Sequence, residues 1–298
     1  MSRFANKRSG IINSMDLKRP QVRFLYWLIF FLLILLVLIC VLPPLWVILS
    51  SMKDLKEFLQ VPPTILPKSF HPEKLGQVWA GQPVQGNGEY TLILAAGNVV
   101  FSITLNGLAG YVLSRLKPKG STLVFTLMLW TLMLPNSVSM VPVFKNIVNV
   151  PLLHINLTDS YIPMWLMAGA SAFNVMVFKS FFDGIPKSLI EAARLDGCSD
   201  LGIFFRIVVP LSVPVLMTML ILTVDGTWKN FFWPYLILRN QDMYTVMVKI
   251  FTMGGSGSNY TIDLQMIALT FSIIPPVILF LFFQRYIMEG FTLSGIKG

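Results

Sequence analysis

A nearly unbroken apolar run from Phe24 to Ser51 constrains the fold of this chain more strongly than any other feature. A helix needs roughly 20 such residues to cross the hydrocarbon core of a bilayer. The run is too long for the core of a signal peptide and has no small-residue cleavage site. We therefore expect a first transmembrane helix here, kinked in its outer part by Pro43 and Pro44. The chain is 55% hydrophobic and 12% charged over 298 residues, which is typical of polytopic membrane proteins.

Five further apolar segments predict an all-α polytopic membrane protein with six transmembrane helices. The expected spans cover about 24–51, 91–116, 121–144, 159–182, 211–238 and 264–287. Pro135 and Pro142 predict kinks or a break in the third span. The chain then divides into a cytoplasmic N-terminal segment (1–23), a first span with an irregular or short-helical outer segment (24–89), a membrane core (90–287) with a cytoplasmic loop at 183–209, and a cytoplasmic tail (288–298).

The formal net charge of +9 is better explained by membrane topology than by nucleic-acid binding. Lysines and arginines gather in the N-terminal segment, in the turn at 115–119 and around the loop at 183–209, where they flank apolar runs. The positive-inside rule then places these segments and both termini in the cytoplasm. Cys40 and Cys198 lie far apart on this topology, so we expect no disulfide. His71 and His154 have no cysteine partner nearby, so we expect no metal site.

The longest amphipathic segment, Ser188 to Pro214, predicts a helical hairpin between the fourth and fifth spans. Ser188 and Glu191 have the spacing of a capping box, in which each side chain satisfies a free backbone N–H of the first helical turn. Gly197 follows the first helix and can take the left-handed conformation that ends it.

The second arm of the hairpin is predicted to begin at Ser199 or Asp200, either of which can cap a helix. Its expected apolar face consists of Leu201, Phe204, Phe205 and Val208. Periodicity alone fits an amphipathic loop lying on the bilayer surface equally well.

The hairpin carries the motif Glu191-Ala192-Ala193, three residues, Gly197, nine residues and Ile207-Val208-Val209-Pro210. This motif resembles the EAA loop of the membrane subunits of bacterial binding-protein-dependent ABC importers, in which the loop docks on a separate ATPase subunit. Three more segments, at 132–142, 227–234 and 290–298, resemble the carbohydrate-uptake (MalG-like) permeases of that family.

The resemblance implies a permease subunit of an importer for a carbohydrate, with an oligosaccharide as the expected solute, in the bacterial cytoplasmic membrane. Its implied partners are a homologous second permease, an external solute-binding protein and two ATPase subunits that hold ATP and Mg²⁺; this chain itself would bind no cofactor. The residues implied for ATPase coupling are Glu191, Ala192, Ala193, Arg194, Asp196, Gly197 and Phe204. Those implied for contact with the binding protein are Gly254, Gly255, Asn259 and Tyr260.

The second span places Asn98, Ser102 and Asn106 on one helical face, with Leu94 expected to face lipid. Polar groups in hydrocarbon need partners, so this face should look inward. It would either form hydrogen bonds between helices or line the solute path. The candidates for the translocation path are Asn98, Ser102, Asn106, Asn174, Trp228 and Asn230.

The sequence contains no G-x-x-x-x-G-K-[ST], H-E-x-x-H or G-x-S-x-G motif, so we expect a transport subunit rather than an enzyme. Two alternatives stay open beside a carbohydrate importer: an ABC permease for another solute, and an ion-coupled secondary transporter. Only Asp225 and Lys229 are charged residues deep in a predicted span that could serve ion coupling, and they could equally pair with each other. A membrane scaffold without transport would explain the spans but not the polar faces or the hairpin.

Overall fold

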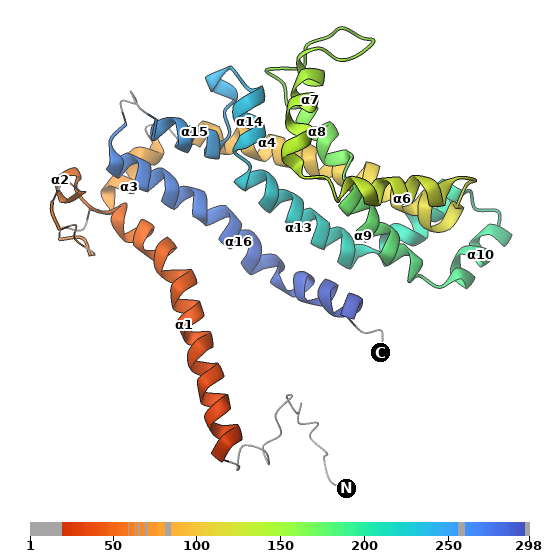
Figure 1. Ribbon diagram of the computed structural model, residues 1–298, viewed down its shortest axis with the longest axis horizontal. Coiled ribbons are helices and arrows are strands. Elements are labelled where there is room, and N and C mark those ends of the chain that lie inside the picture. Colours follow the sequence, from red (N-terminus) through yellow and green to blue (C-terminus); the bar gives the residue numbers. More distant parts are fainter. Residues whose placement is uncertain are drawn as a thin grey trace.

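The computed structural model describes residues 20–58, 60–62, 64, 66–68, 71–80, 85–255 and 260–295. All the regular secondary structure in these residues is helical (Figure 1), as the sequence predicts.

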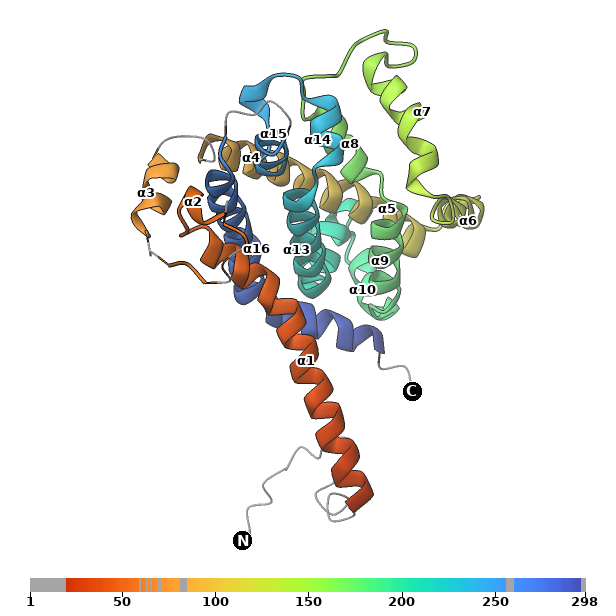
Figure 2. The same cartoon turned by 60° about the vertical axis from the view of Figure 1, so that its left-hand side comes forward.

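The first span is α1 (Pro20–Ser50), a long apolar helix that projects away from the rest of the chain (Figures 1 and 2). It stays one helix through Pro43 and Pro44. Its apolar side chains between Phe24 and Trp46 are largely exposed. A helix that is apolar on all sides is suited to hydrocarbon or to a partner that covers it.

The second span is the central element of the membrane core. It joins α4 (Gln85–Phe101), the π-helical turn η2 (Ser102–Asn106), α5 (Gly107–Tyr111) and a second π-helical turn, η3 (Val112–Leu116). It begins before the predicted residue 91 and ends at the predicted residue 116. It packs against α8, α9 and α13, whose bounds follow. A Cβ on Gly110 would lie 2.8 Å from the Cβ of Phe178 in α9, so this close helix crossing requires a glycine.

The predicted third span consists of two helices, α6 (Ser121–Thr131) and α7 (Asn136–Val148). They are separated at Pro135, whose backbone is extended with a ψ of 134°. The predicted break at Pro135 is therefore confirmed, while Pro142 lies inside α7.

Two further predicted spans are bent rather than continuous. The fourth consists of α8 (Ile162–Gly169) and α9 (Ala172–Asp183), which meet at 41°. At the start of the fifth, the second arm of the hairpin meets α13 (Val213–Lys229) at 80°. Three of the described helices are long and apolar enough to cross a membrane, or five if each bent pair is one span.

The remaining helices connect and close the core. They are α2 (Leu55–Phe58), α3 (Glu73–Ala80), α14 (Phe232–Ile237), the 3₁₀ turn η5 (Gln241–Met243), α15 (Val246–Met253) and α16 (Ile262–Gly295). The outer segment is short-helical, as predicted. Lys74 ties it to the start of α16, because its Nζ lies 2.6 Å from a carboxylate oxygen of Asp54 and 3.8 Å from one of Asp263. Helix α16 continues beyond the expected sixth span, so the predicted tail is helical as far as Gly295.

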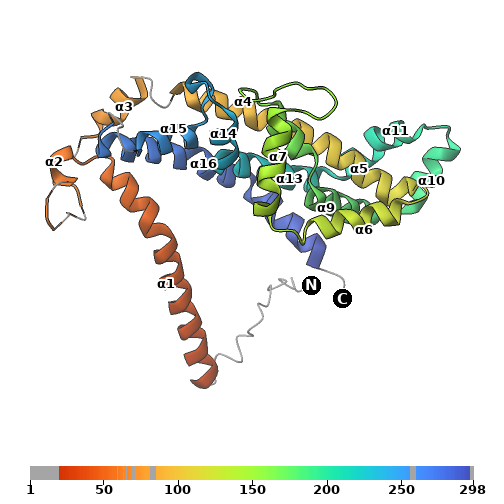
Figure 3. The same cartoon turned by 45° about the horizontal axis from the view of Figure 1, so that its top comes forward.

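The hairpin lies at the opposite end of the molecule from α2 and α3 (Figure 3). Its elements are α10 (Lys187–Leu195), α11 (Asp200–Ile203), the π-helical turn η4 (Phe204–Val208) and α12 (Val209–Leu211).

Candidate functional site

The first arm of the hairpin begins differently from the prediction. Pro186 occupies the position before the helix, with φ −56° and ψ 130°, and no side chain caps the first turn. Ser188 therefore lies inside α10, where its hydroxyl cannot reach back to cap the helix. The predicted capping box between Ser188 and Glu191 is wrong, because the proline sets the start of the helix two residues earlier.

The turn between the arms forms around Gly197, which has a φ of +79°. The N–H of Gly197 donates to the carbonyl of Arg194, and the N–H of Cys198 donates to the carbonyl of Ala193, both at 3.0 Å. These two bonds form a Schellman motif, which satisfies the last carbonyls of a helix and depends on a left-handed residue at this position. The predicted role of Gly197 as the helix stop is confirmed.

The second arm begins at Ser199, as predicted. Its Oγ accepts a hydrogen bond of 3.2 Å from the N–H of Gly202. An ion pair of 3.0 Å between Arg194 and Asp200 also joins the two arms across the turn.

The apolar face predicted for the second arm is wrong in part. Phe204 and Val208 are buried, but Leu201 and Phe205 are 63% and 60% exposed, and Ile203 is buried in their place. Phe205 lies in the π-helical turn η4, whose wider turn departs from the 3.6-residue period that the prediction assumes. Leu201 lies in the short helix α11, before that turn, at the exposed tip of the hairpin.

The coupling candidates divide into an exposed set and a buried set. Glu191, Ala192, Arg194, Asp196 and Gly197 are exposed. Ala193 and Phe204 are buried within this chain, so they hold the hairpin in place rather than offering their side chains to a partner. Sequence reasoning missed Leu195, which is 90% exposed at the hairpin tip and, with Leu201, forms an apolar surface there.

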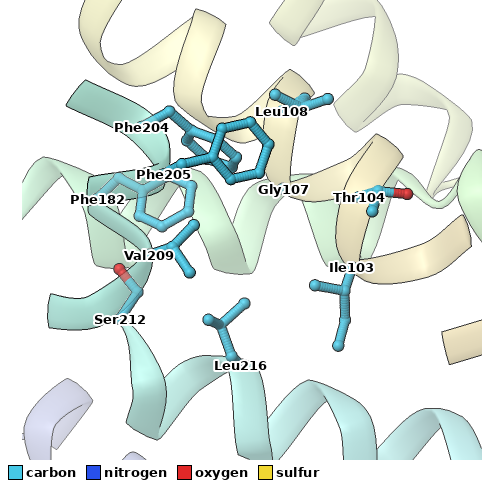
Figure 4. A pocket seen from close by; sticks show the side chains of 10 residues that line it. All are labelled: Ile103, Thr104, Gly107, Leu108, Phe182, Phe204, Phe205, Val209, Ser212 and Leu216. Atoms are coloured by element: carbon cyan, nitrogen blue, oxygen red, sulfur yellow. The ribbon is translucent and has the colours of Figure 1, made fainter. Parts of the chain in front are cut away.

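The hairpin is anchored by a buried apolar cluster shared with the second, fourth and fifth spans. The hairpin supplies Ile190, Ala193, Ile203, Phe204 and Val208, and the spans supply Tyr111, Phe178, Phe182, Val215 and Met219. Beside this cluster lies an apolar cavity of about 140 Å³. Figure 4 shows Phe205, Val209 and Leu216 on one side of it and Ile103 and Thr104 of the second span on the other.

The polar face of the second span forms hydrogen bonds between helices. Asn106 is fully buried, and its Oδ1 accepts from the N–H of Ser171 at 3.0 Å while its Nδ2 donates to the carbonyl of Ala168 at 2.9 Å. These are backbone groups freed by the break between α8 and α9. Nearby, Ser102 Oγ accepts from the Nδ2 groups of Asn174, at 2.9 Å, and of Asn106, at 3.3 Å. Of the two roles predicted for this face, the geometry favours bonding between helices.

Other path candidates also bond between or within helices. Asn98 donates to Thr227 Oγ1 of α13 at 2.8 Å. The indole N–H of Trp228 donates at 3.0 Å to the carbonyl of Ser272, which lacks its usual helical donor because residue 276 is a proline. Asn230 Oδ1 accepts from the N–H of Trp233 at 3.4 Å.

Two further expectations can be compared with the structure. Leu94 is 1% exposed and packs in a cluster with Met164, so its predicted lipid-facing position is wrong. Asp225 and Lys229 form an ion pair of 2.8 Å within α13, which confirms the predicted pairing.

The residues implied for the binding-protein contact lie around the end of α15. Gly254 and Gly255 directly follow the helix, and the Nζ of Lys249 lies 5.3 Å from the ring centroid of Tyr260. Asn259 lies outside the described residues. Among the residues that the structure describes, no group of three or more His, Cys, Asp or Glu side chains could hold a metal ion.

Comparison with known proteins identifies the family. Residues 103–291 match the family described as binding-protein-dependent transport system inner membrane component. The arabinooligosaccharides transport system permease protein AraQ of Bacillus subtilis is 36% identical, over 70% of this chain and 72% of its own. The sn-glycerol-3-phosphate transport system permease protein UgpE of Yersinia enterocolitica is 31% identical, over 83% of this chain and 89% of its own.

A solved structure shares the fold. A chain of a bacterial ABC transporter involved in the import of the acidic polysaccharide alginate matches with a TM-score of 0.79 and 23% identity, over 90% of this chain and 98% of that one. The chain described here therefore belongs to the family of inner-membrane components of binding-protein-dependent transport systems.

Proposed function

We propose that this chain is one permease subunit of an ATP-driven ABC importer for an oligosaccharide. Its six spans and both termini would be arranged as the basic segments predict, with the hairpin in the cytoplasm of a bacterial inner membrane. Its partners would be a homologous second permease, two ATPase subunits that bind ATP and Mg²⁺, and an external solute-binding protein.

The observation that carries this proposal is the hairpin itself. Its turn is built on a left-handed Gly197, its tip exposes Leu195 and Leu201, and its base is fixed in a buried cluster with three spans. A protruding apolar tip on a rigid base suits a docking element, because a few anchor residues supply most of the binding energy of an interface. A loop that merely lies on the bilayer would not need an anchored base.

The substrate class rests on the relatives. The names of AraQ and of the alginate transporter both refer to chains of sugars. UgpE, whose name refers to glycerol 3-phosphate, keeps a non-sugar solute as the second candidate. An ion-coupled mechanism is not favoured, because Asp225 and Lys229 already neutralise each other on one helix.

In this proposal the chain performs no chemistry. ATP would close the ATPase pair, the hairpin would be displaced with it, and the buried cluster would pass this displacement to the second, fourth and fifth spans. Close packing makes such transmission possible, since protein interiors are dense and deform little.

Purification and uptake test the proposal directly. The tagged chain, extracted in mild detergent from its own cells, should bring down two further kinds of subunit, an ATPase and a second permease, as identified by mass spectrometry. Proteoliposomes of this complex should take up arabinotriose in an ATP-dependent way when the binding protein is present. Uptake of glycerol 3-phosphate instead would replace the oligosaccharide assignment, and uptake driven by a proton gradient without ATP would overturn the ABC assignment.

The topology is tested by cysteine labelling. A cysteine at Ser256, which lies outside the described residues, should react in intact spheroplasts with a thiol reagent that cannot cross the membrane. The native Cys198 in the hairpin should react only after the membrane is permeabilised. Labelling of Cys198 from outside would reverse the proposed orientation.

A further inference from the structure

The cytoplasmic end of the second span carries three polar side chains that hold segments on both sides of the hairpin. Tyr111 ends α5, Ser114 and Arg115 lie in the π-helical turn η3, and all three side chains bond to the end of the fourth span or to the hairpin. We propose that Tyr111 and Arg115 are positioning residues for energy coupling, which fasten the hairpin to the second span so that its displacement reaches that span directly. This inference rests on the proposed function.

Arg115 holds the point at which the fourth span ends and the hairpin begins. Its Nη2 donates to the carbonyls of Phe182, in the last turn of α9, and Ile185, just before α10. The last carbonyls of a helix carry partial negative charge and can accept more than one hydrogen bond, as the carbonyl of Phe182 also accepts from the N–H of Ile185 at 3.1 Å. A guanidinium is suited to this place because its charge is permanent and its N–H groups can reach two acceptors at once.

Ser114 and Asp183 strengthen the same junction. The Oγ of Ser114 donates to Asp183 Oδ1 at 2.7 Å, and Ser114 is 3% exposed. Asp183 also pairs with Lys179, one turn earlier in α9, at 2.7 Å. The end of α9 is therefore held by side chains of the second span and of its own helix.

Tyr111 contacts the other arm of the hairpin. It is 2% exposed, its ring centroid lies 5.1 Å from that of Phe204, and its hydroxyl donates to the carbonyl of Asp200 at 3.3 Å. Asp200 begins α11 and Phe204 begins the π-helical turn η4. The cytoplasmic end of the second span thus holds the first arm through Arg115 and the second arm through Tyr111.

The backbone leaves little freedom for these elements to slide. A Cβ on Gly110 would lie 3.0 Å from the backbone nitrogen of Lys179, as well as close to Phe178, so the second span and α9 are in direct contact. The second span is not adjacent to the hairpin in the sequence, whereas the fourth and fifth spans are. Chain connectivity alone would pass a displacement of the hairpin only to the fourth and fifth spans. The contacts of Tyr111 and Arg115 pass it to the second span as well.

The test measures uptake per ATP hydrolysed in proteoliposomes of the complete complex, using arabinotriose or glycerol 3-phosphate, whichever the parent transports. Arg115→Gln removes the charge and most of the donor capacity. The complex that carries Arg115→Gln should keep its ATPase subunits and hydrolyse ATP. Its uptake per ATP should fall about tenfold or more, because hydrogen bonds from charged groups are strong. Arg115→Lys should recover part of this loss, and Tyr111→Phe should lower the ratio about twofold to fivefold.

Lys119→Gln is the matched control, because it makes the same change in charge at an exposed position of the same basic turn. This variant should keep the parent's ratio of uptake to ATP hydrolysis. A role in stability alone would reduce uptake and ATP hydrolysis together and leave their ratio unchanged. Parent ratios in both Arg115→Gln and Tyr111→Phe would overturn the inference, and if Arg115→Gln fails to insert, Tyr111→Phe decides alone. A parent chain that retains no ATPase would refute the proposed function instead.

Discussion

Replacing Gly197 with valine should produce a normally inserted protein that has lost most of its ATPase. The φ of +79° costs a residue with a Cβ roughly 1–2 kcal/mol, and a branched residue more. A Cβ at this position would meet no atom within 4 Å, so the whole cost arises from the backbone and not from collision. The chain can escape it only by unwinding the turn that holds the Ala193 and Arg194 carbonyls.

Unwinding this turn would move the exposed tip residues Leu195 and Leu201 relative to each other. A shift of 1–2 kcal/mol lowers the ratio of native to unwound hairpin by about 5–30-fold. Co-purified ATPase per inserted permease should fall, because the unwound hairpin no longer presents its tip in the docking geometry. Gly197→Asn is the matched control, because asparagine tolerates the left-handed region, and it should retain most of the ATPase. Full retention and full uptake in Gly197→Val would argue against the hairpin as the docking element.

Features that depend on a few neighbouring residues were predictable from the sequence. The left-handed turn at Gly197, the cap at Ser199 and the break at Pro135 each follow from the local chemistry of one residue. The pairing of Asp225 with Lys229 follows from helical spacing. The end of the second span at residue 116 coincides with a short basic turn, which marks the membrane boundary.

Features that depend on a change of helical period were not predictable. The sequence pattern assumes 3.6 residues per turn, but Phe205 lies in the π-helical turn η4 and is exposed. Leu201 is exposed for another reason, because it lies in the short helix α11 at the tip of the hairpin. The position of Leu94 has a different cause. Its carbonyl accepts the indole N–H of Trp165 at 3.2 Å and its side chain packs with Met164, because α8 covers the side of the second span that was expected to face lipid.

For contacts between segments that are far apart in the sequence, only the kind of interaction was predictable. The sequence indicates that Asn98, Asn106 and Trp228 need partners, but not which ones. Trp228 bonds a carbonyl 44 residues away in the chain that Pro276 leaves free. For Arg115, the sequence does not distinguish a side chain that holds the hairpin from a basic residue that marks the membrane boundary. The i, i+3, i+4 spacing of Tyr111, Ser114 and Arg115 at the end of an apolar span is the signal that could have indicated the first of these roles.

Replacing Asn106 with leucine should weaken the bend in the fourth span and reduce transport. The asparagine amide accepts from the Ser171 N–H and donates to the Ala168 carbonyl, so it replaces the backbone bonds that α8 and α9 lack where they meet at 41°. Leucine has the same branched shape and the same number of side-chain heavy atoms but no polar atoms, and it would leave both backbone groups without a partner in a buried site. Hydrogen bonds between membrane helices are worth about 0.6–2 kcal/mol each, so the loss of two should lower stability by about 1–3 kcal/mol.

The matched control is Thr104→Leu, a polar-to-leucine change in the same π-helical turn. Thr104 is exposed, and its hydroxyl donates to the carbonyl of Val100 in its own helix, at 2.5 Å. Thermal unfolding in detergent should separate the two variants, and ATP-dependent uptake should separate them further, because a bend that has lost its bonds can adopt other angles. Asn106→Asp should also be impaired, since an ionised carboxylate still accepts from Ser171 but opposes the Ala168 carbonyl with a second acceptor. If Asn106→Leu and Thr104→Leu unfold at the same temperature and transport equally well, Asn106 merely fills space beside the bend, and the fourth span holds its angle by packing alone.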